Sequence, residues 1–235
     1  MTRPVLLNNV EHKDLRIDTE RSATLGDAVM SALTFPAEFR DVQAHYPIVF
    51  QRTSATDYQP LALLGLQEGE NLFLEGDRWQ AAYVPLAIER QPFLIGASGA
   101  DLLVHVDLDH PRARGAAGQA LFREHGGTTD YLDRITSVLL ALHDGLQATP
   151  AFVDALVRHE LLESFVLDVE LDDGSQHRLA GFHTINEERL QALDEAALGQ
   201  LQRAGHLEPV YMALASLSHF RDLIQRKNRL RAGGR

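Results

Sequence analysis

The chain contains no cysteine among its 235 residues. This absence excludes disulfide bonds, thiolate metal ligands and a cysteine nucleophile. Long apolar runs are also missing, since none approaches the ~20 residues that a membrane-spanning helix needs. The N-terminal sequence has no apolar segment typical of a signal peptide. We therefore predict a cytoplasmic protein with no transmembrane segment.

Basic residues are few, with 22 Lys and Arg against 33 Asp and Glu and a formal charge of −11. An acidic surface disfavours broad contact with nucleic-acid phosphates, so we expect no nucleic-acid partner. Basic residues gather only in residues 220–235, where cations suit a helix C-terminus, although a nucleic-acid or membrane contact is the alternative. No glycine-rich phosphate loop and no nucleophile elbow appear.

The first half of the chain is dominated by strand signals after one short helix. That helix is predicted over residues 36–46, because Pro36 suits its first position and the apolar residues share one face. Pro47 ends it, and a β-prone run follows. Further strands are predicted over residues 61–67, 71–76, 78–84, 93–96 and 102–108, with turns at Gly69 and Gly76. Residues 107–127 are predicted to form a loop with at most one helical turn.

The second half mixes helical spacing with one hairpin. A helix is predicted from Thr129 to Gly145 and another from Thr149-Pro150 onward. Alternating apolar residues before the turn at Gly174 predict a β-hairpin over residues 165–182. The remaining predictions are helices capped by Asn186 and Asp194, the second closed by Gly205, a strand over 207–214, and a terminal helix capped by Ser216.

This order of elements predicts an α+β fold. Its N-terminal part is a mostly antiparallel β-sheet, and its C-terminal part mixes helices with a hairpin. Composition changes near residues 107–130. The sequence therefore predicts a division between residues 1–127 and 128–235, unless the two form one continuous domain.

Aromatic and polar residues between the strands form a candidate ligand pocket. Trp79 and Tyr83 share one face of their predicted strand and would supply aromatic walls. Asn71 and Arg90 would hold a peptide, a carboxylate or a ring by hydrogen bonds. The alternative is a sheet core in which Arg90 pairs with an acid. The predicted ligand-binding set is Tyr46, Asn71, Trp79, Tyr83, Arg90 and Phe93.

Histidines and aspartates suggest a second candidate. His105, Asp107 and Asp109 would lie on one face of an extended strand, and His-x-Asp is half of a two-histidine, one-carboxylate iron site. His177 or His183 could supply a distal ligand, or the two could act as a base and its partner. The alternatives are a polar strand end and solvated histidines. We predict no metal and no cofactor, and the sequence assigns no catalytic residue.

A linear pattern of motifs spans most of the chain. It comprises Tyr46-Pro47-Ile48-Val49-Phe50, Leu64-Gly65, Asn71-Leu72-Phe73, Trp79 with Tyr83 and Pro85, and Arg90 with Pro92-Phe93. Over roughly residues 12–225 the sequence resembles the SapC family of bacterial proteins. A peptide-transport permease shares that name, but this chain lacks the apolar spans that such a permease requires.

The resemblance implies an association with bacterial surface layers or with TonB-dependent uptake systems, near halogenase-like and cupin-like proteins. It implies no particular reaction. We therefore expect an accessory protein that binds a peptide or protein partner. An enzyme that modifies a peptide or small molecule with a halogenase-like or cupin-like partner is the main alternative. A structural component of the surface layer is the third.

Overall fold

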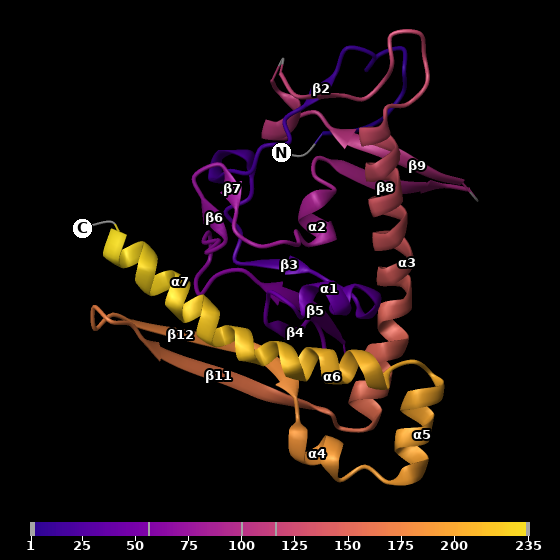
Figure 1. Cartoon of the computed structure of the whole chain (residues 1–235). Helices are drawn as coiled ribbons and strands as arrows, with labels where there is room; N and C mark the ends of the chain where they lie inside the picture. Colours follow the sequence, from indigo (N-terminus) through magenta and orange to yellow (C-terminus); the bar gives the residue numbers. More distant parts are fainter. Residues whose placement is uncertain (1–2, 56, 100, 116, 234–235) are drawn as a thin grey trace. The chain divides into compact units, whose positions relative to one another are not determined.

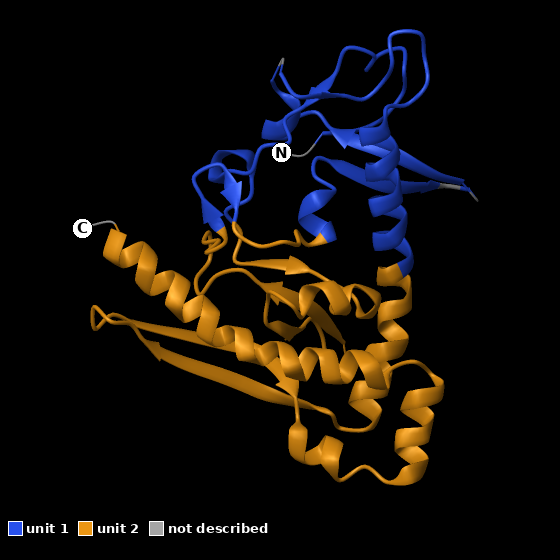
Figure 2. Cartoon of the chain, viewed as in Figure 1, with its two compact units in different colours: residues 1–28, 74–79, 86–144 blue, residues 29–73, 80–85, 145–235 orange. Residues whose placement is uncertain are grey.

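A computed structural model of the chain describes residues 3–55, 57–99, 101–115 and 117–233. The chain divides into two compact units, each assembled from separate stretches of sequence (Figure 2). Unit 1 comprises residues 1–28, 74–79 and 86–144, and unit 2 comprises residues 29–73, 80–85 and 145–235. The division between residues 127 and 128, which was based on composition, stays a prediction.

Unit 1 is built on a three-stranded antiparallel sheet with the order β1-β9-β8. Val106, in the central strand, pairs with Val5 on one side and Phe93 on the other. The strands of the unit are β1 (Pro4–Leu6), β2 (Arg16–Ile17), β6 (Leu74–Glu75), β7 (Arg78–Trp79), β8 (Phe93–Ser98), β9 (Asp101–Asp107) and β10 (Gln119–Ala120). Its helical elements are η1 (Ala23–Leu25), α2 (Leu86–Glu89), η3 (Pro111–Ala113) and the first part of α3 (Asp130–Arg158).

The core of unit 1 gathers apolar side chains from this sheet, from β2 and from the first turns of α3. Burial of these side chains removes apolar surface from water and is the main stabilising contribution to the unit. The buried cluster consists of Ile17, Phe93, Val106, Ala113, Leu121, Leu132, Ile135 and Leu139.

Unit 2 contains a five-stranded antiparallel sheet with the order β11-β12-β4-β5-β3, and α6 and α7 run along it (Figure 1). The strands are β3 (Ser31–Leu33), β4 (Ile48–Arg52), β5 (Tyr58–Leu63), β11 (Leu162–Glu170) and β12 (Gln176–Ile185). The helical elements are η2 (Pro36–Glu38), α1 (Phe39–Val42), the second part of α3, α4 (Glu187–Gln191), α5 (Glu195–Arg203), α6 (Leu207–Ser216), η4 (Leu217–His219) and α7 (Phe220–Gly233).

Several predictions about local structure are confirmed, beginning with the α+β class. The hairpin forms as predicted, with Val169 opposite His177 and a positive φ of 78° at Gly174. Asn186 and Asp194 cap their helices, because their side chains accept hydrogen bonds from the backbone N–H groups three residues later. Local capping and turn residues therefore determine where this hairpin and these two helices form.

The predicted strand over residues 78–84 is mostly wrong. β7 ends at Trp79, and the Gln80 N–H then donates to the Phe73 carbonyl at 2.7 Å. Trp79 and Tyr83 therefore do not share one face of a strand. The prediction over residues 71–76 is also too long, because only Leu74 and Glu75 pair, in a short hairpin with β7. Residues 107–127, predicted as a loop with at most one helical turn, contain the single turn η3 and, beyond the prediction, the short strand β10.

The predicted break between Gly145 and Pro150 is wrong, because α3 continues through both residues. Proline in a helix removes one hydrogen bond and costs about 3 kcal/mol. Beyond it, however, Phe152, Val153 and Leu156 are buried at helical spacing. The packing of these side chains outweighs the tendency of Pro150 to break the helix.

The predicted strand over residues 207–214 is helix α6. Its buried residues follow helical rather than alternating spacing: Pro209, Val210, Met212, Ala213 and Ser216. Ser216 does not cap the next helix. Its hydroxyl donates to the Ala213 carbonyl at 2.6 Å and accepts the Ile48 N–H at 2.8 Å, which joins α6 to β4. Across the described residues, no helix combines the length and apolar character needed to cross a membrane.

Candidate functional site

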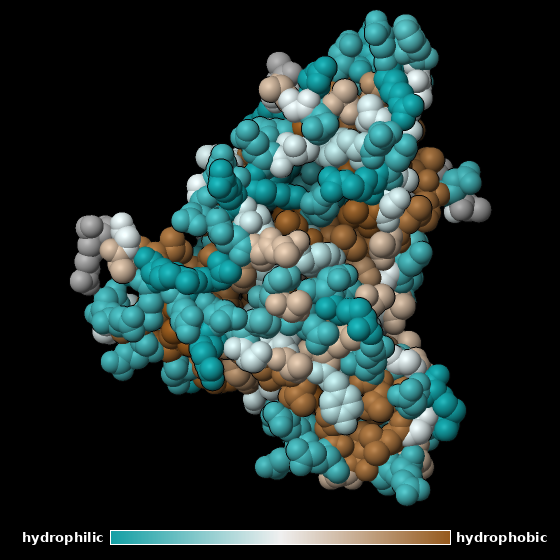
Figure 3. Space-filling view, in the orientation of Figure 1, coloured by the Kyte–Doolittle hydropathy of each residue, from teal (hydrophilic) through white to brown (hydrophobic). Residues whose placement is uncertain are grey.

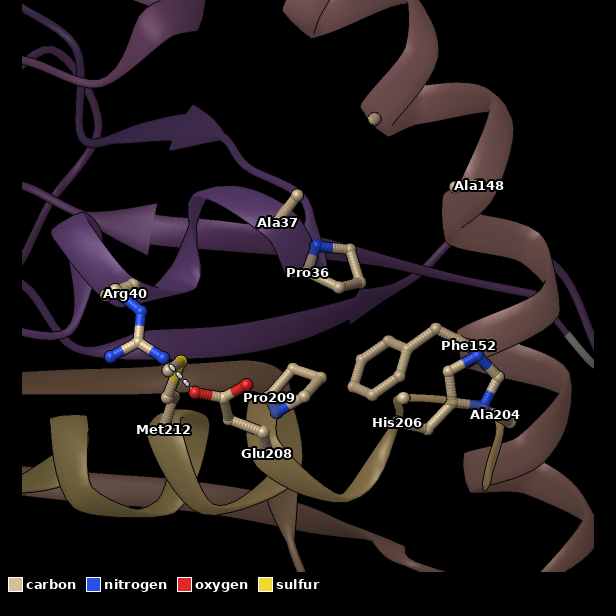
Figure 4. Close-up of a pocket in the computed structure, with 12 residues that line it drawn as sticks. Pro36, Ala37, Arg40, Ala148, Phe152, Ala204, His206, Glu208, Pro209 and Met212 are labelled. Atoms are coloured by element: carbon tan, nitrogen blue, oxygen red, sulfur yellow. Dashed lines mark hydrogen bonds and ion pairs between the residues drawn. The ribbon is translucent and has the colours of Figure 1, made fainter. Parts of the chain in front are cut away.

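A groove in unit 2 is the candidate functional site (Figure 4). It has a volume of about 330 Å³ and lies among η2, α1, α3 and the start of α6. Figure 3 shows hydrophobic atoms gathered over α5 and the start of α6. The side chains that define the groove below are Pro36, Arg40, Ala148, Phe152, His206, Glu208, Pro209 and Met212.

The junction between α5 and α6 shapes one side of the groove. Gly205 adopts a positive φ of 72°, which a residue with a side chain would adopt only with strain. The His206 N–H then donates to the Leu201 carbonyl at 2.9 Å and closes α5. Pro209 lies in the first turn of α6, where the missing N–H costs no helical hydrogen bond. The local sequence therefore places His206 between two helices.

The floor of the groove is aromatic. The ring of His206 meets the ring of Phe152 edge-on, with centroids 5.6 Å apart. Phe152 in turn meets Phe39 edge-on at 6.0 Å, so it is anchored in the core of unit 2. Nδ1 of His206 is buried and has no hydrogen-bond partner within the described residues. Burial lowers the pKa of His206 below its ordinary value, which favours the neutral ring.

An ion pair between Arg40 and Glu208 lies on the rim of the groove (Figure 4). The two side chains are 67% and 62% exposed. An exposed pair of this kind contributes about 0–1 kcal/mol to stability. Both charges can therefore exchange their partner for a ligand at little cost.

Three of the predicted ligand-binding residues, Tyr46, Asn71 and Tyr83, belong to unit 2, and two of them are in direct contact. The hydroxyl of Tyr46 donates to the Tyr83 carbonyl, and the hydroxyl of Tyr83 donates to Glu38 Oε1 at 2.9 Å. Thr34 donates to the other oxygen of Glu38 at 2.8 Å. Burial, and then the nearby Glu38 carboxylate, raise the pKa of Tyr83. Asn71 Oδ1 accepts the backbone N–H two residues later at 3.0 Å.

The other three predicted residues belong to unit 1. Trp79 pairs with Leu74 across the β6–β7 hairpin. Arg90 donates to the Phe93 carbonyl at 2.6 Å, and burial lowers the pKa of its guanidinium. Phe93 is fully buried, and its ring meets Tyr131 with centroids 6.3 Å apart. Whether the six residues share one ligand stays a prediction.

Two of the histidine and aspartate candidates, Asp107 and His183, make contacts that support the local structure. Asp107 Oδ1 accepts the backbone N–H groups of Arg3 at 2.8 Å and Asp109 at 3.0 Å, which fixes the end of β9. His183 lies edge-on to Tyr58 at 4.9 Å, and burial followed by the charge of Arg52 lowers its pKa. Among the described residues, no three His, Cys, Asp or Glu side chains form a group that could hold a metal ion.

Sequence reasoning missed the groove, although its residues carried a signal. Gly205 followed by His206 and Pro209 is a helix stop followed by a helix start. This helix start was not recognised, because residues 207–214 were predicted to form a strand. Arg40 and Glu208 are far apart in sequence, so only the folded chain brings their charges together.

Comparison with known proteins gives one match, to a family model. No curated protein and no solved structure matches the chain. The family model described as SapC matches residues 7–223. This match covers nearly the whole sequence, and we conclude that the chain belongs to the SapC family.

Proposed function

We propose that this protein is a non-catalytic binding protein that holds a short peptide segment of a partner in the unit 2 groove. The observation that carries the proposal is the combination of an apolar groove with the unpartnered Nδ1 of His206. A peptide offers both an apolar side chain for the walls and a backbone N–H or C=O group for the histidine.

The composition of the walls supports a peptide ligand. Pro36, Pro209 and Phe152 are rigid and keep the groove formed, whereas Met212 is flexible and adapts to different apolar side chains. The charges of Arg40 and Glu208 on the rim can engage a carboxylate, an ammonium group or a charged side chain of the same peptide. We further propose that the partner comes from a surface-layer or TonB-dependent uptake system, which is what the resemblance to the SapC family implies.

Filling the groove should weaken peptide binding. Ala148 is an exposed residue of α3 that lines the groove (Figure 4), and Ala151 is an exposed residue of the same helix that does not. We expect Ala148→Trp to weaken binding at least about tenfold, because the indole occupies the space of the ligand. Ala151→Trp should bind as the wild type does. Both changes are made at exposed positions, so both variants should fold.

The measurement starts from a library of random peptides displayed on phage and selected on the wild-type protein. Enriched peptides are synthesised with a fluorescent label, and their affinities for the three proteins are measured by fluorescence anisotropy. Selective loss in Ala148→Trp supports the proposal. Equal affinities for the three proteins, or the absence of any enriched peptide, would overturn it.

Acid should destabilise the folded chain partly through His206. Because the folded-state pKa of His206 is lowered, the unfolded state binds the proton first as the pH falls below the ordinary value of about 6.5. The free energy of unfolding therefore falls with the pH between 6.5 and the lowered folded-state pKa. His206→Phe keeps a ring against Phe152 and should flatten this part of the profile. Urea titrations at a series of pH values measure both profiles, and parallel profiles would contradict the prediction.

A further inference from the structure

Unit 1 contains a polar cavity of about 310 Å³ that the proposed peptide groove does not involve. It lies among residues 18–21, the segment around the end of α2, η3 and the first turns of α3. Its walls carry several guanidinium groups although the chain as a whole is acidic. The lining residues that matter for its chemistry are Arg21, Glu89, Gln91, Arg112, Tyr131 and Arg134.

Glu89 forms ion pairs with two of the arginines that line this cavity. One of its carboxylate oxygens forms an ion pair with Arg21, and the other lies 2.9 Å from a nitrogen of Arg134. The side chain of Arg134 is 62% exposed, while those of Arg21 and Glu89 are 17% and 15% exposed. A guanidinium group has five N–H donors on three nitrogens, and the ion pair with Glu89 is made through one nitrogen of Arg134. Arg134 therefore keeps donors for a ligand.

Two buried polar atoms on the same walls have no hydrogen-bond partner within the described residues. These atoms are Nε of Arg112, a donor, and Oε1 of Gln91, an acceptor. Arg112 is 1% exposed, and its other nitrogens bind Asp27 and two backbone carbonyls. Leaving a buried polar group unpaired costs free energy, because the group has lost its hydrogen bonds to water. A ligand that supplied an acceptor and a donor would recover this free energy.

Tyr131 adds a neutral donor beside an apolar ring. Burial, and then the charge of Glu89, raise the pKa of Tyr131 to about 12. Its hydroxyl therefore keeps its proton at neutral pH and can donate to an anionic ligand group. The ring meets Phe93 at 6.3 Å, which ties this wall to the core of unit 1.

We propose that the cavity binds a free α-amino acid. Its carboxylate would lie against the donors of Arg134, Arg112 and Tyr131, and its ammonium group against Gln91 Oε1 and the lining carboxylates of Asp18 and Glu89. A simple anion would leave the acceptors unpaired, and a simple cation would leave the donors unpaired. A compact zwitterion satisfies both sets.

The test uses three probes that share one carbon skeleton: L-alanine, L-lactate and propionate. They carry an ammonium group, a hydroxyl group and a hydrogen at the α-carbon. Titration calorimetry on the full chain at low salt should give the tightest binding for L-alanine and the weakest for propionate. The common L-amino acids are then screened in the same way for the preferred side chain.

Two variants locate the site. Arg134→Gln should weaken binding of all three probes by about tenfold, because it removes a charge-assisted contact with the shared carboxylate. Gln91→Leu should lower the affinity for L-alanine towards that of propionate. Arg123→Gln is the matched control, because the side chain of Arg123 is 60% exposed, lies in the same unit and is outside the cavity. Equal affinities for L-alanine and propionate, tighter binding of lactate, no binding of any probe, or equal losses in Arg123→Gln and Arg134→Gln would each overturn the proposal.

Discussion

Replacement of Asp27 with alanine is expected to lower the free energy of unfolding of unit 1 by about 3–5 kcal/mol. Asp27 is fully buried, and its Oδ2 lies 2.6 Å from a nitrogen of Arg112. The same oxygen accepts the Ser22 N–H at 2.9 Å, and Oδ1 lies 3.5 Å from Arg21. Removal of the carboxylate leaves the Arg112 guanidinium charged and buried without its counter-ion.

Urea unfolding followed by tryptophan fluorescence measures this loss, because Trp79 is the single tryptophan of the chain and belongs to unit 1. Asp130→Ala is the control. The side chain of Asp130 is 96% exposed, and its pair with Arg123 should contribute less than about 1 kcal/mol. Similar losses for the two variants would show that the buried pair is not the main polar contact of unit 1.

Gly145→Ala is expected to destabilise unit 2 by about 1–3 kcal/mol or more. An alanine Cβ at this position would lie 2.1 Å from Cδ2 of Phe35 and 2.4 Å from Cε2. Phe35 is 3% exposed, so its ring has no free space to move into. In an open helix the same change would stabilise by roughly 0.5–1 kcal/mol. The clash therefore reverses the sign expected from helix propensity.

Two further variants test this cause. Gly199→Ala in α5 meets only the flexible end of Arg203, at 3.1 Å, and should be neutral or slightly stabilising. Phe35→Leu should recover part of the loss when combined with Gly145→Ala, because the smaller side chain vacates the clash. Thermal and urea unfolding of the single and double variants give the coupling free energy. Additive effects would contradict a direct contact between the two residues.

Local chemistry accounts for the elements that the sequence predicted well. The hairpin at Gly174 and the helices after Asn186 and Asp194 depend on residues within a few positions of one another. Tertiary packing determines the secondary structure of the segments that were predicted wrongly. Pro150 lies inside α3 because the residues after it are buried in unit 2, and residues 207–214 are helical because their buried face follows helical spacing. The burial that holds Pro150 inside the helix is not visible in a short window of sequence, whereas the start of α6 left a local signal at Gly205 and Pro209.

The candidate sites were harder to predict from the sequence than the helices and strands, because they depend on contacts between residues that are distant in the sequence. Tyr46 and Tyr83 both belong to the predicted ligand-binding set, and the structure joins them through a hydroxyl and a carbonyl. The strand that was predicted to place Trp79 and Tyr83 on one face ends at Trp79. Glu38, which binds Tyr83, was not recognised, because its burial depends on the fold. The ring of His206 packs against Phe152, which is more than 50 positions away in the sequence. Burial there lowers the pKa of His206.

The sheet order of unit 2 has a consequence for synthesis on the ribosome. β4 ends at Arg52, but its neighbour β12 begins only at Gln176. At about 5–20 residues per second, on the order of ten seconds separates the emergence of the two strands. During that time one edge of β4 is unpaired, and an unpaired edge can pair with other chains. We expect the nascent chain to engage chaperones until the hairpin of β11 and β12 emerges and covers that edge.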